Sequence, residues 1–455
     1  MVCQVSLAQV IHAIAPARVS LNESLKPPEQ ISVIGINTDS RTLQPGQLFV
    51  ALEGERFNGH VFAEQAVARG AIAAVVRQGA LAADISRLEV TDTLAAYQAL
   101  GRWWRQQRGL PVVAITGSVG KTTTKELIAA ALAHHGHVLK TQANYNNEIG
   151  VPKTLLELAP EHQFAVIEMG MRGPGEIALL TQIAQPDVAV ITNVGTAHIG
   201  RLGSEQAIAD AKCELLAELP AGGTAVLNYD SPRLMATAQR VWSGRQITYG
   251  LTGGDVQGRL VDSETLEVEQ ISLPLPLPGE HNALNLLAAI AVLQALNLDW
   301  QFLKAGLSIE LPAGRAKRIS LPNNILLLDE TYNAGYESMV AALRLLAAQP
   351  GQRHIAVLGT MKELGHKSIE LHHRVGQTVQ QLGLDQLFIL ADPAEAQALR
   401  QGADPIPSQL FENHASLTAA LHTFIQPGDC LLFKASRSVA LDQVVEPLKQ
   451  QCLSH

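Results

Sequence analysis

The sequence predicts an α/β protein of three domains, and three observations lead to that fold class. The chain of 455 residues is too long for one hydrophobic core, because a domain usually holds about 100 to 200 residues. Near-continuous β-branched runs, each followed by a loop and a helical pattern, begin at Pro111 and are typical of parallel strands buried on both faces. A second series follows the LPAG turn at 311–314. We therefore expect domain boundaries near residues 109 and 313.

The first predicted domain, 1–108, shows short apolar runs around a turn-rich stretch. LFVAL (48–52) and AIAAVV (71–76) flank EGERFNGH, and a helical pattern covers 94–107. This mixture favours a small α/β domain.

Strands of the second and third domains are predicted from their apolar runs. In 109–312 these runs are PVVAIT (111–116), FAVIEMG (164–170) and VAVITNVG (188–195). In 313–455 they are ILLLDE (325–330), HIAVLG (354–359), LFIL (387–390) and CLLFK (430–434). Because open α/β sheets bind ligands at the carboxyl ends of their strands, loops after these runs are the candidate sites.

Composition and charge narrow the class of protein. With 47% hydrophobic and 17% charged residues the chain has a globular composition, and its net charge of −8 argues against a basic surface for nucleic acid or anionic membranes. A local basic pocket for an acidic ligand is compatible with that charge. The N-terminus has no secretory pattern, and the apolar segment 283–296 is too short for a bilayer span. We expect a cytoplasmic protein without membrane insertion.

Cysteine usage and helix patterns bear on compartment and assembly. The four cysteines, Cys3, Cys213, Cys430 and Cys452, are scattered without metal-ligand spacing. Free thiols in a reducing compartment are the preferred interpretation. No heptad repeat or long apolar helix is evident, so we expect a monomer.

The stretch AITGSVGKTTTKE (114–126) predicts a phosphate-binding loop. The usual pattern G-x-x-x-x-G-K-[ST] would place its first glycine at 115, where Ile115 stands instead. Gly117 and Gly120 allow backbone N–H groups to turn toward a phosphate at the start of a helix near Lys121. The Lys121 ammonium can neutralise outer phosphates, and the Thr122 hydroxyl can ligate Mg²⁺. An ordinary glycine-rich turn is the alternative, which the combination of strand, glycines and helix disfavours.

Two further strand ends carry groups suited to a metal. Glu168 ends the run FAVIE, and His198 follows VAVITNVGTA, so both are expected at the sheet edge that carries the phosphate loop. A carboxylate suits Mg²⁺, whereas histidine is less typical for so hard an ion. Taken singly, Glu168 is typical of a solvated acid in a loop, and His198 is typical of a hydrogen-bonded loop residue. The metal-site interpretation and the loop interpretation therefore both stay open.

Other charged residues have equally plain alternatives. Lys212 lies in an Ala-rich helical pattern, whose periodicity favours a surface lysine. Asp329 and Glu330 end ILLLDE, where acids either touch a ligand held between domains or simply begin a loop. Arg315 and Arg318 either clamp phosphates from the opposite side or form a solvated basic turn.

Taken together, ordered motifs across the whole chain resemble those of the Mur ligase family, ATP-dependent amide-forming enzymes of peptidoglycan precursor synthesis. The similarity rests on TGSVGKTTTKE, NVGTAHIGRLGS, AKCELL, GEHNALNLLAAIAV, AGRAKRI and LLLDETYNAGYESMVAAL. It implies a central P-loop-type parallel-sheet ATPase domain between an N-terminal UDP-binding domain and a C-terminal Rossmann-like domain. The last domain would close on the nucleotide.

The resemblance also implies roles for single residues. ATP would be bound by Gly117, Ser118, Val119, Gly120, Lys121, Thr122, Thr123, Asn282, Arg315 and Asp329. Mg²⁺, as two ions, would be held by Thr122, Glu168, His198 and Lys212, the last carbamylated to N6-carboxylysine. Lys121, His198 and Lys212 would be the catalytic residues.

Substrate residues follow from the same resemblance. The UDP-linked substrate would be bound by Ser40, Arg41, Asn144, Asn146 and Asn147, and a dipeptide by Asn333 and Tyr336. Three departures from the family pattern are Asn58 in place of Asp, Thr360 in place of Asp, and Gly335-Tyr336 in place of Asn-Pro.

TQANYNNEIGVPKTLLEL (141–158), VLGTMKELG and FKASRSVALDQVVEPL resemble the branch of the family that adds a dipeptide. The implied reaction joins D-alanyl-D-alanine to UDP-N-acetylmuramoyl-tripeptide through an acyl phosphate. The alternatives are an amide ligase that adds one amino acid, including the folylpolyglutamate type, and a regulatory P-loop nucleotide switch. The chain has no N-K-x-D sequence for reading guanine, which counts against a GTP switch.

Overall fold

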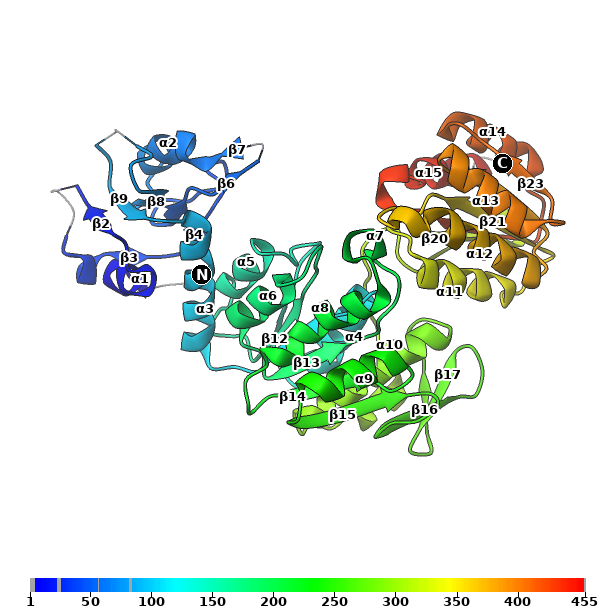
Figure 1. Ribbon diagram of the computed structural model, residues 1–455, viewed down its shortest axis with the longest axis horizontal. Helices are drawn as coiled ribbons and strands as arrows, with labels where there is room; N and C mark the ends of the chain where they lie inside the picture. The colour runs from blue at the N-terminus through cyan, green and yellow to red at the C-terminus, as the bar shows by residue number, and fades with distance from the viewer. Residues whose placement is uncertain (1–4, 23–25, 56, 82–83, 454–455) are drawn as a thin grey trace.

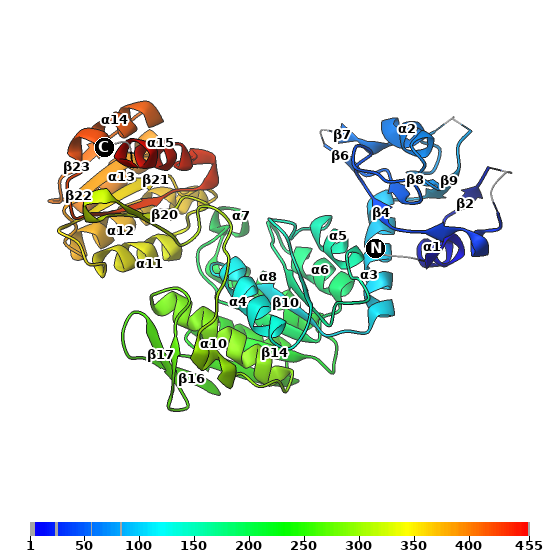
Figure 2. The same ribbon diagram turned by 180° about the vertical axis from the view of Figure 1, so that it is seen from behind.

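The computed structural model describes residues 5–22, 26–55, 57–81 and 84–453, with side chains through residue 450. Three α/β domains follow one another along the molecule, and the first and last lie at opposite ends (Figure 1). Figure 2 shows the same order from behind. Each domain is built on one main sheet, so the predicted α/β class is confirmed. The exact boundaries near 109 and 313 stay predictions.

The N-terminal domain carries a five-stranded sheet in the order β2-β9-β8-β5-β4. Its described elements are β1 (Val5–Ser6), α1 (Leu7–Ile14), β2 (Arg18–Ser20), η1 (Pro28–Gln30), β3 (Ser32–Val33), β4 (Ile36–Asn37), β5 (Leu48–Val50), β6 (Glu53–Gly54), β7 (Phe57–Asn58), η2 (Gly59–Phe62), α2 (Ala63–Ala68), β8 (Ala74–Arg77), β9 (Arg87–Val90) and α3 (Thr93–Arg108). The predicted runs at 48–52 and 71–76 overlap β5 and β8, and α3 is the predicted helix that leads into the middle domain.

The middle domain carries a nine-stranded sheet in the order β11-β12-β10-β13-β14-β15-β16-β17-β18. Its elements are β10 (Val112–Thr116), α4 (Lys121–Ala133), β11 (Val138–Lys140), α5 (Gly150–Leu156), β12 (Phe164–Glu168), α6 (Glu176–Ala184), β13 (Val188–Ile191), α7 (Ile199–Leu202), α8 (Glu205–Ala217), β14 (Thr224–Asn228), α9 (Pro232–Val241), β15 (Arg245–Gly250), β16 (Val256–Leu260), β17 (Thr265–Val268), β18 (Ile271–Pro274), α10 (Glu280–Ala295) and η3 (Gln301–Ala305). All pairs from β11 to β16 are parallel, and β17 and β18 add an antiparallel extension.

Helices cover both faces of the middle sheet. One face packs on α4 and α10. Helix α10 has buried apolar residues on all its sides from Ala283 to Leu293, as expected for a helix enclosed by protein. The opposite face packs on α5, α6 and α8 together with α3 of the N-terminal domain. Because both faces are covered, the strands read as continuous apolar runs, as predicted for a parallel sheet.

The C-terminal domain carries a six-stranded sheet in the order β19-β20-β24-β21-β22-β23, in which β19 alone is antiparallel to its neighbour. Its elements are β19 (Lys317–Leu321), η4 (Pro322–Asn324), β20 (Ile325–Glu330), α11 (Tyr336–Ala347), β21 (Arg353–Gly359), η5 (Gly365–Lys367), α12 (Ser368–Gln381), β22 (Gln386–Leu390), α13 (Pro393–Ala403), β23 (Ser408–Leu410), α14 (His414–Phe424), β24 (Asp429–Lys434), η6 (Arg437–Val439) and α15 (Asp442–Leu453). Helices α11, α12 and α13 cover one face, and α14 and α15 cover the other.

A buried ion pair in the C-terminal domain gives a stability prediction. The Asp429 carboxylate is buried and accepts hydrogen bonds from Arg353 Nε (2.8 Å) and Nη2 (2.7 Å). We expect Asp429→Ala to lower the free energy of unfolding of this domain by about 3 kcal/mol, because it leaves the guanidinium without its partner. Urea denaturation measures this loss. Lys367→Ala, which removes the exposed pair with Glu370, should cost much less, because exposed ion pairs contribute little, and equal costs would contradict the prediction.

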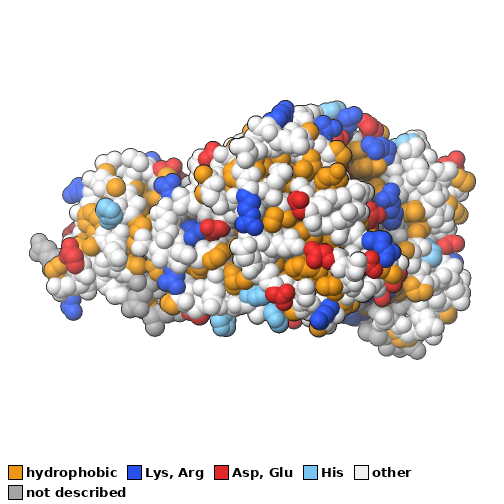
Figure 3. Space-filling view, turned by 90° about the horizontal axis from the view of Figure 1, so that it is seen from below, with side chains coloured by type: hydrophobic (Ala, Val, Ile, Leu, Met, Phe, Trp, Pro, Cys, Tyr) orange, Lys and Arg blue, Asp and Glu red, His pale blue; other side chains and the backbone are white. Residues whose placement is uncertain are grey.

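The surface and the thiols fit the expectations from composition. On the face seen in Figure 3, basic and acidic side chains are interspersed. Among the described helices none is long and apolar enough to cross a membrane. Cys213 and Cys430 are buried free thiols, and burial raises the pKa of each to about 12, so both are inert. Cys3 and the side chain of Cys452 lie outside the described residues.

Candidate functional site

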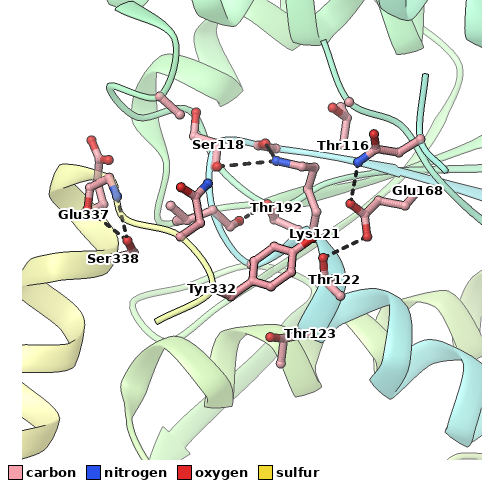
Figure 4. Close-up of a pocket in the computed structure, with 18 of the residues that line it drawn as sticks. Thr116, Ser118, Lys121, Thr122, Thr123, Glu168, Thr192, Tyr332, Glu337 and Ser338 are labelled. Atoms are coloured by element: carbon pink, nitrogen blue, oxygen red, sulfur yellow. Dashed lines mark hydrogen bonds between the residues drawn. The ribbon is translucent and has the colours of Figure 1, made fainter. Parts of the chain in front are cut away.

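A pocket of about 1180 Å³ lies between the middle and C-terminal domains. The middle domain contributes the loop 116–123, the ends of β12 and β13 and the start of α10, and the C-terminal domain contributes the segments 312–316 and 330–338. Figure 4 shows Lys121 of the middle domain and Tyr332 of the C-terminal domain around the same pocket. The predicted phosphate loop therefore faces a second domain across an enclosed space large enough for a nucleotide.

The loop needs glycine at two positions for steric reasons. A Cβ on Gly117 would lie 1.9 Å from Thr192 Oγ1, and a Cβ on Gly120, whose φ is +84°, would lie 2.8 Å from Asn285 Oδ1. Ile115 is completely buried within β10, at the position where the usual pattern has glycine. The loop is thus compact because its strand continues through residue 116.

Hydrogen bonds tie this loop to the segment after β13. The N–H groups of Ser118 and Val119 donate to the carbonyl (3.1 Å) and side-chain (3.0 Å) oxygens of Asn193. These two N–H groups are therefore engaged by protein, whereas the sequence suggested that they face a phosphate. Lys121 lies at the first turn of α4 and donates from Nζ to Gly117 O at 2.7 Å. The helix N-terminus and the Lys121 ammonium remain as the candidate phosphate-binding elements.

Glu168 ends β12 directly beside this loop. Its Oε2 accepts a hydrogen bond from Thr122 Oγ1 at 2.9 Å, and its Oε1 accepts one from Asn146 Nδ2 at 2.9 Å. The side chain is buried, so the solvated loop acid considered from the sequence is wrong. A hydroxyl and a carboxylate oxygen meet at one point, which is a donor pair suited to Mg²⁺.

Lys212 is the clearest departure from the sequence-based interpretation. Periodicity favoured a surface lysine, but the residue is 2% exposed in α8 and lines the pocket. No hydrogen bond or ion pair of its amine occurs within the part of the chain that is described. Burial, with Lys121 nearby, holds the pKa of the Lys212 amine well below its usual range. Burial therefore increases the neutral, nucleophilic fraction of the Lys212 amine at a given pH.

His198 lies at the N-cap of α7 in a left-handed conformation, with φ at +66°. Its Nδ1 is 2.6 Å from Oε2 of Glu363 in the C-terminal domain. Burial lowers the pKa of His198, and the Glu363 carboxylate opposes that shift. A neutral imidazole retains a lone pair on one nitrogen, which a metal ion requires.

A metal ion at this site would need ligands beyond the side chains that the protein supplies. Within the described residues no group of three His, Cys, Asp or Glu side chains gathers closely enough to hold an ion. Mg²⁺ commonly uses one or two carboxylates together with substrate phosphates and water. The Thr122–Glu168 pair beside the phosphate loop fits an ion that arrives with a nucleotide.

On the C-terminal side, Arg315 is placed to meet an anion. Its guanidinium stacks on the Tyr332 ring at 3.9 Å, and its buried Nε has no hydrogen-bond partner. Arg318 is exposed and does not line the pocket, so the structure does not show the two-arginine clamp considered from the sequence. Asp329 does not line the pocket either. Its carboxylate accepts a hydrogen bond from Thr331 Oγ1 at 2.6 Å.

Of the remaining predicted residues, Asn282 and Asn333 line the pocket. Tyr336 does not, because its ring lies under the Arg374 guanidinium at 4.5 Å, on the side of α11 that faces α12. The predicted contact of Tyr336 with a dipeptide therefore has no support in this arrangement.

The five predicted UDP-substrate residues divide into two groups. Asn144, Asn146 and Asn147 line the pocket beside Glu168. Ser40 and Arg41 lie in the N-terminal domain, where Arg41 forms an exposed ion pair with Asp39 at 2.7 Å. The Arg41 guanidinium holds the pKa of Asp39 at about 2. The structure does not bring the two groups into one pocket.

Comparisons with known proteins agree over all three domains. Residues 32–102 match the Mur ligase family, catalytic domain; residues 115–293 match the Mur ligase middle domain; and residues 314–437 match the Mur ligase, glutamate ligase domain. A relative from Synechocystis, a UDP-N-acetylmuramoyl-tripeptide–D-alanyl-D-alanine ligase, is 57% identical over 92% of this chain and 93% of its own. The chain belongs to the Mur ligase family.

Solved structures support the same assignment for this Mur ligase. The crystal structure of MurF from Acinetobacter baumannii matches with a TM-score of 0.88 at 33% identity over 99% of both chains. The MurF ligase from Thermotoga maritima in complex with ADP matches with a TM-score of 0.82 at 30% identity over 92% of this chain and 98% of that one.

At each of the three positions where this Mur ligase departs from the family pattern, the residue present forms a local hydrogen bond. Asn58 caps η2 and accepts from the His60 N–H at 3.0 Å. Thr360 Oγ1 accepts from Asp392 N at 2.8 Å. Gly335 begins α11, and its N–H donates to Ser338 Oγ at 3.1 Å. The hydroxyl of Ser338 therefore closes the turn at the start of α11.

Sequence reasoning missed several pocket residues of the Mur ligase. Asn193 and Thr192, which hold the phosphate loop, follow β13 directly and were detectable as polar residues at a strand end. No sequence pattern indicated that Glu337 and Glu363 would line the pocket. Their carboxylates reach the middle domain only because the two domains are docked, with Thr196 N donating to Glu337 Oε1 at 2.7 Å.

Proposed function

We propose that this Mur ligase joins D-alanyl-D-alanine to UDP-N-acetylmuramoyl-tripeptide and converts ATP to ADP and phosphate. The observation that carries the proposal is the pocket in which Lys121 and Arg315, from two domains, line one space. The relatives' names support the choice of substrates. The amide-forming chemistry of the family supports the reaction class.

The proposed nucleotide site uses both sides of the pocket. The phosphates lie against the start of α4, where Lys121 offsets their charge, and the unpartnered Nε of Arg315 donates from the opposite side. Asn282, at the start of α10, would contact the base, and Asp329 would have to turn from Thr331 to reach the nucleotide. Mg²⁺ would be held by Thr122 and Glu168 with His198 nearby, and when bound it supplies charge neutralisation and a template for two anions.

The proposed reaction has two steps. The tripeptide carboxylate attacks the γ-phosphorus of ATP, so that a carboxyl oxygen–phosphorus bond forms, the bond to the ADP oxygen breaks, and an acyl phosphate results. The amine of D-alanyl-D-alanine then attacks the acyl carbon, an amide bond forms, and phosphate leaves with the electron pair while the amine loses a proton. The residues of this pocket act by positioning and by offsetting the repulsion between carboxylate and phosphate.

The UDP-linked substrate is proposed to run from the N-terminal domain to the pocket. Arg41 and Ser40 would hold the diphosphate end, and Asn146, which contacts Glu168, would orient the carboxyl end. The charge of Lys153 in the middle domain adds a small contribution to the lowered pKa of Asp39. The substrates also place the proposed activity in the cytoplasm, and light scattering would test the expected monomer.

Phosphate release tests the proposal and its alternatives. With ATP and UDP-N-acetylmuramoyl-tripeptide, release should depend on D-alanyl-D-alanine and should not occur with single amino acids as acceptors. Preference for one amino acid would favour a single-residue ligase instead. GTP hydrolysis without any acceptor dependence would favour a nucleotide switch.

Arg315→Ala gives a prediction on nucleotide binding. Because the guanidinium offers a buried donor with no protein partner, its loss should raise the KM for ATP about tenfold with a smaller change in kcat. Initial rates against ATP concentration measure both quantities. Arg318→Ala, a neighbouring exposed arginine outside the pocket, is the matched control and should leave the KM unchanged. Equal effects of the two substitutions would remove Arg315 from the site.

A further inference from the structure

A carboxylate of the C-terminal domain binds the middle domain close to the phosphate loop. Glu337 lies in the first turn of α11, and its Oε1 accepts a hydrogen bond from Thr196 N at 2.7 Å. Its Oε2 accepts a second one from Thr196 Oγ1 at 3.2 Å. Thr196 is buried in the segment that follows β13. Because hydrogen bonds to a carboxylate are stronger than those between neutral groups, this two-point contact opposes separation of the domains.

The approach of Glu337 depends on the absence of a side chain at position 195. A Cβ built on Gly195 would lie 2.6 Å from Glu337 Cδ and 2.7 Å from Glu337 Oε1, and the three nearest atoms to it all belong to Glu337. The φ of Gly195 is outside the left-handed region, so the backbone does not itself exclude alanine. Glycine is therefore required at this position for the contact with Glu337.

The segment that Glu337 contacts also holds the phosphate loop. Gly195 N donates to Ser118 Oγ at 2.8 Å. The Val119 N–H donates to Asn193 Oδ1 at 3.0 Å, and Asn193 Nδ2 donates to the Val119 carbonyl at 3.0 Å. Figure 4 shows Glu337 and Ser118 on two sides of the same pocket. Hydrogen bonds of residues 193–196 therefore connect the phosphate loop to the C-terminal domain.

The pocket needs both domains in place. Lys121 comes from the middle domain and Arg315 from the C-terminal domain, and both line it. A second contact between the domains follows on the same stretch of chain, where the Gly200 N–H donates to the Glu363 carbonyl at 3.0 Å. A ligand that is held by both domains binds the docked form, so its apparent affinity falls with the docked fraction. A residue that sets this fraction changes the affinity without touching the ligand.

We propose that Glu337 is a positioning residue, which docks the C-terminal domain on residues 193–196 and thereby orders the phosphate loop before a nucleotide arrives. The inference rests on the proposed function, because that function makes a nucleotide the ligand of both domains. The opposite role would be a carboxylate that repels the incoming phosphates. Both Glu337 oxygens already accept hydrogen bonds from Thr196, which favours the docking role. Removal of a docking residue weakens nucleotide binding, whereas removal of a repelling charge strengthens it.

Hydrogen–deuterium exchange of the protein without ligands tests the docking contact directly. In Glu337→Ala we expect exchange of the amides in 193–198 to rise by at least about tenfold, because the Thr196 N–H loses a charged acceptor. The rise should extend to the loop 117–120. Glu337→Gln keeps an acceptor oxygen for that N–H and should exchange nearly as the wild type does. Glu370→Ala, an exposed glutamate of the same domain, is the matched control and should change nothing.

Calorimetric titration with ADP supplies the second readout. Glu337→Ala should raise the Kd for ADP by about threefold to tenfold, and Glu337→Gln should stay close to the wild type. Gly195→Ala, whose methyl group would displace the Glu337 carboxylate, should raise the Kd by a similar factor. The double variant should bind no more weakly than either single variant, because both substitutions remove one contact.

Three results would overturn the proposal: unchanged exchange of 193–198 in Glu337→Ala, tighter ADP binding by that variant, or additive effects of the Gly195 and Glu337 substitutions. The exchange measurement needs neither a ligand nor the ligase reaction. A protein that shows the expected exchange but no acceptor-dependent phosphate release would contradict the proposed function and leave the docking role of Glu337 intact.

Discussion

Lys121→Ala is expected to reduce kcat by about 10²-fold to 10³-fold, equivalent to about 3 to 4 kcal/mol of transition-state stabilisation. The Lys121 ammonium is held at the start of α4 by its hydrogen bond to Gly117 O, so in the proposed site it is already ordered beside the phosphates. Burial lowers the pKa of Lys121, and Glu168 opposes that shift, so an arriving anion further favours the charged form. Acceptor-dependent phosphate release at saturating ATP measures the loss.

Controls are needed because Lys121 is half-buried, so its substitution removes packing as well as charge. Lys304→Ala removes an exposed lysine from η3 of the same domain and should leave turnover unchanged. Thermal denaturation of Lys121→Ala should show a folded protein. If that folded variant turned over at a near-normal rate, the loop 117–123 would not be a catalytic phosphate-binding loop.

The sequence predicted the parallel strands well, because burial on both faces leaves a clear pattern. The runs at 111–116, 164–170 and 188–195 became β10, β12 and β13, with Glu168 and the phosphate loop at one sheet edge. The extension from β14 to β18 was not predicted. Its outer strands are half exposed and pair antiparallel, so they lack the continuous apolar runs on which the prediction depended.

Burial of single polar residues was harder to predict than strands. Lys212 lies in a helix whose pattern fits a surface lysine, and only the packing of α8 against its neighbours shows that the amine is enclosed. Contacts between domains, such as His198 with Glu363, join residues 165 positions apart and depend on docking, which no local pattern encodes. The site was therefore predicted where it follows strand ends and missed where it spans two domains.

Lys212→Ala is expected to lower kcat by at least about 10²-fold and to regain part of the activity with added acetate or propionate. An amine can give a metal no anionic oxygen, but a neutral amine that reacts with CO₂ forms a carbamate and releases a proton. Because burial lowers the pKa of Lys212, more of its amine is in the reacting neutral form at a given pH than for an exposed lysine, and that fraction increases as pH rises. A short carboxylic acid can occupy the space that the lysine leaves and replace the carbamate oxygens.

Labelled bicarbonate separates this explanation from a purely structural role. The wild type should show a ¹³C carbamate signal that is absent in Lys212→Ala. Cys213→Ala, which removes volume from the next buried position of α8 without reaching the pocket, should keep both the signal and the activity. Full activity of Lys212→Ala without added acid would exclude a catalytic role. A wild type without a carbamate signal, together with a folded, inactive Lys212→Ala variant that acid does not rescue, would assign the amine itself, and not a carbamate, to catalysis.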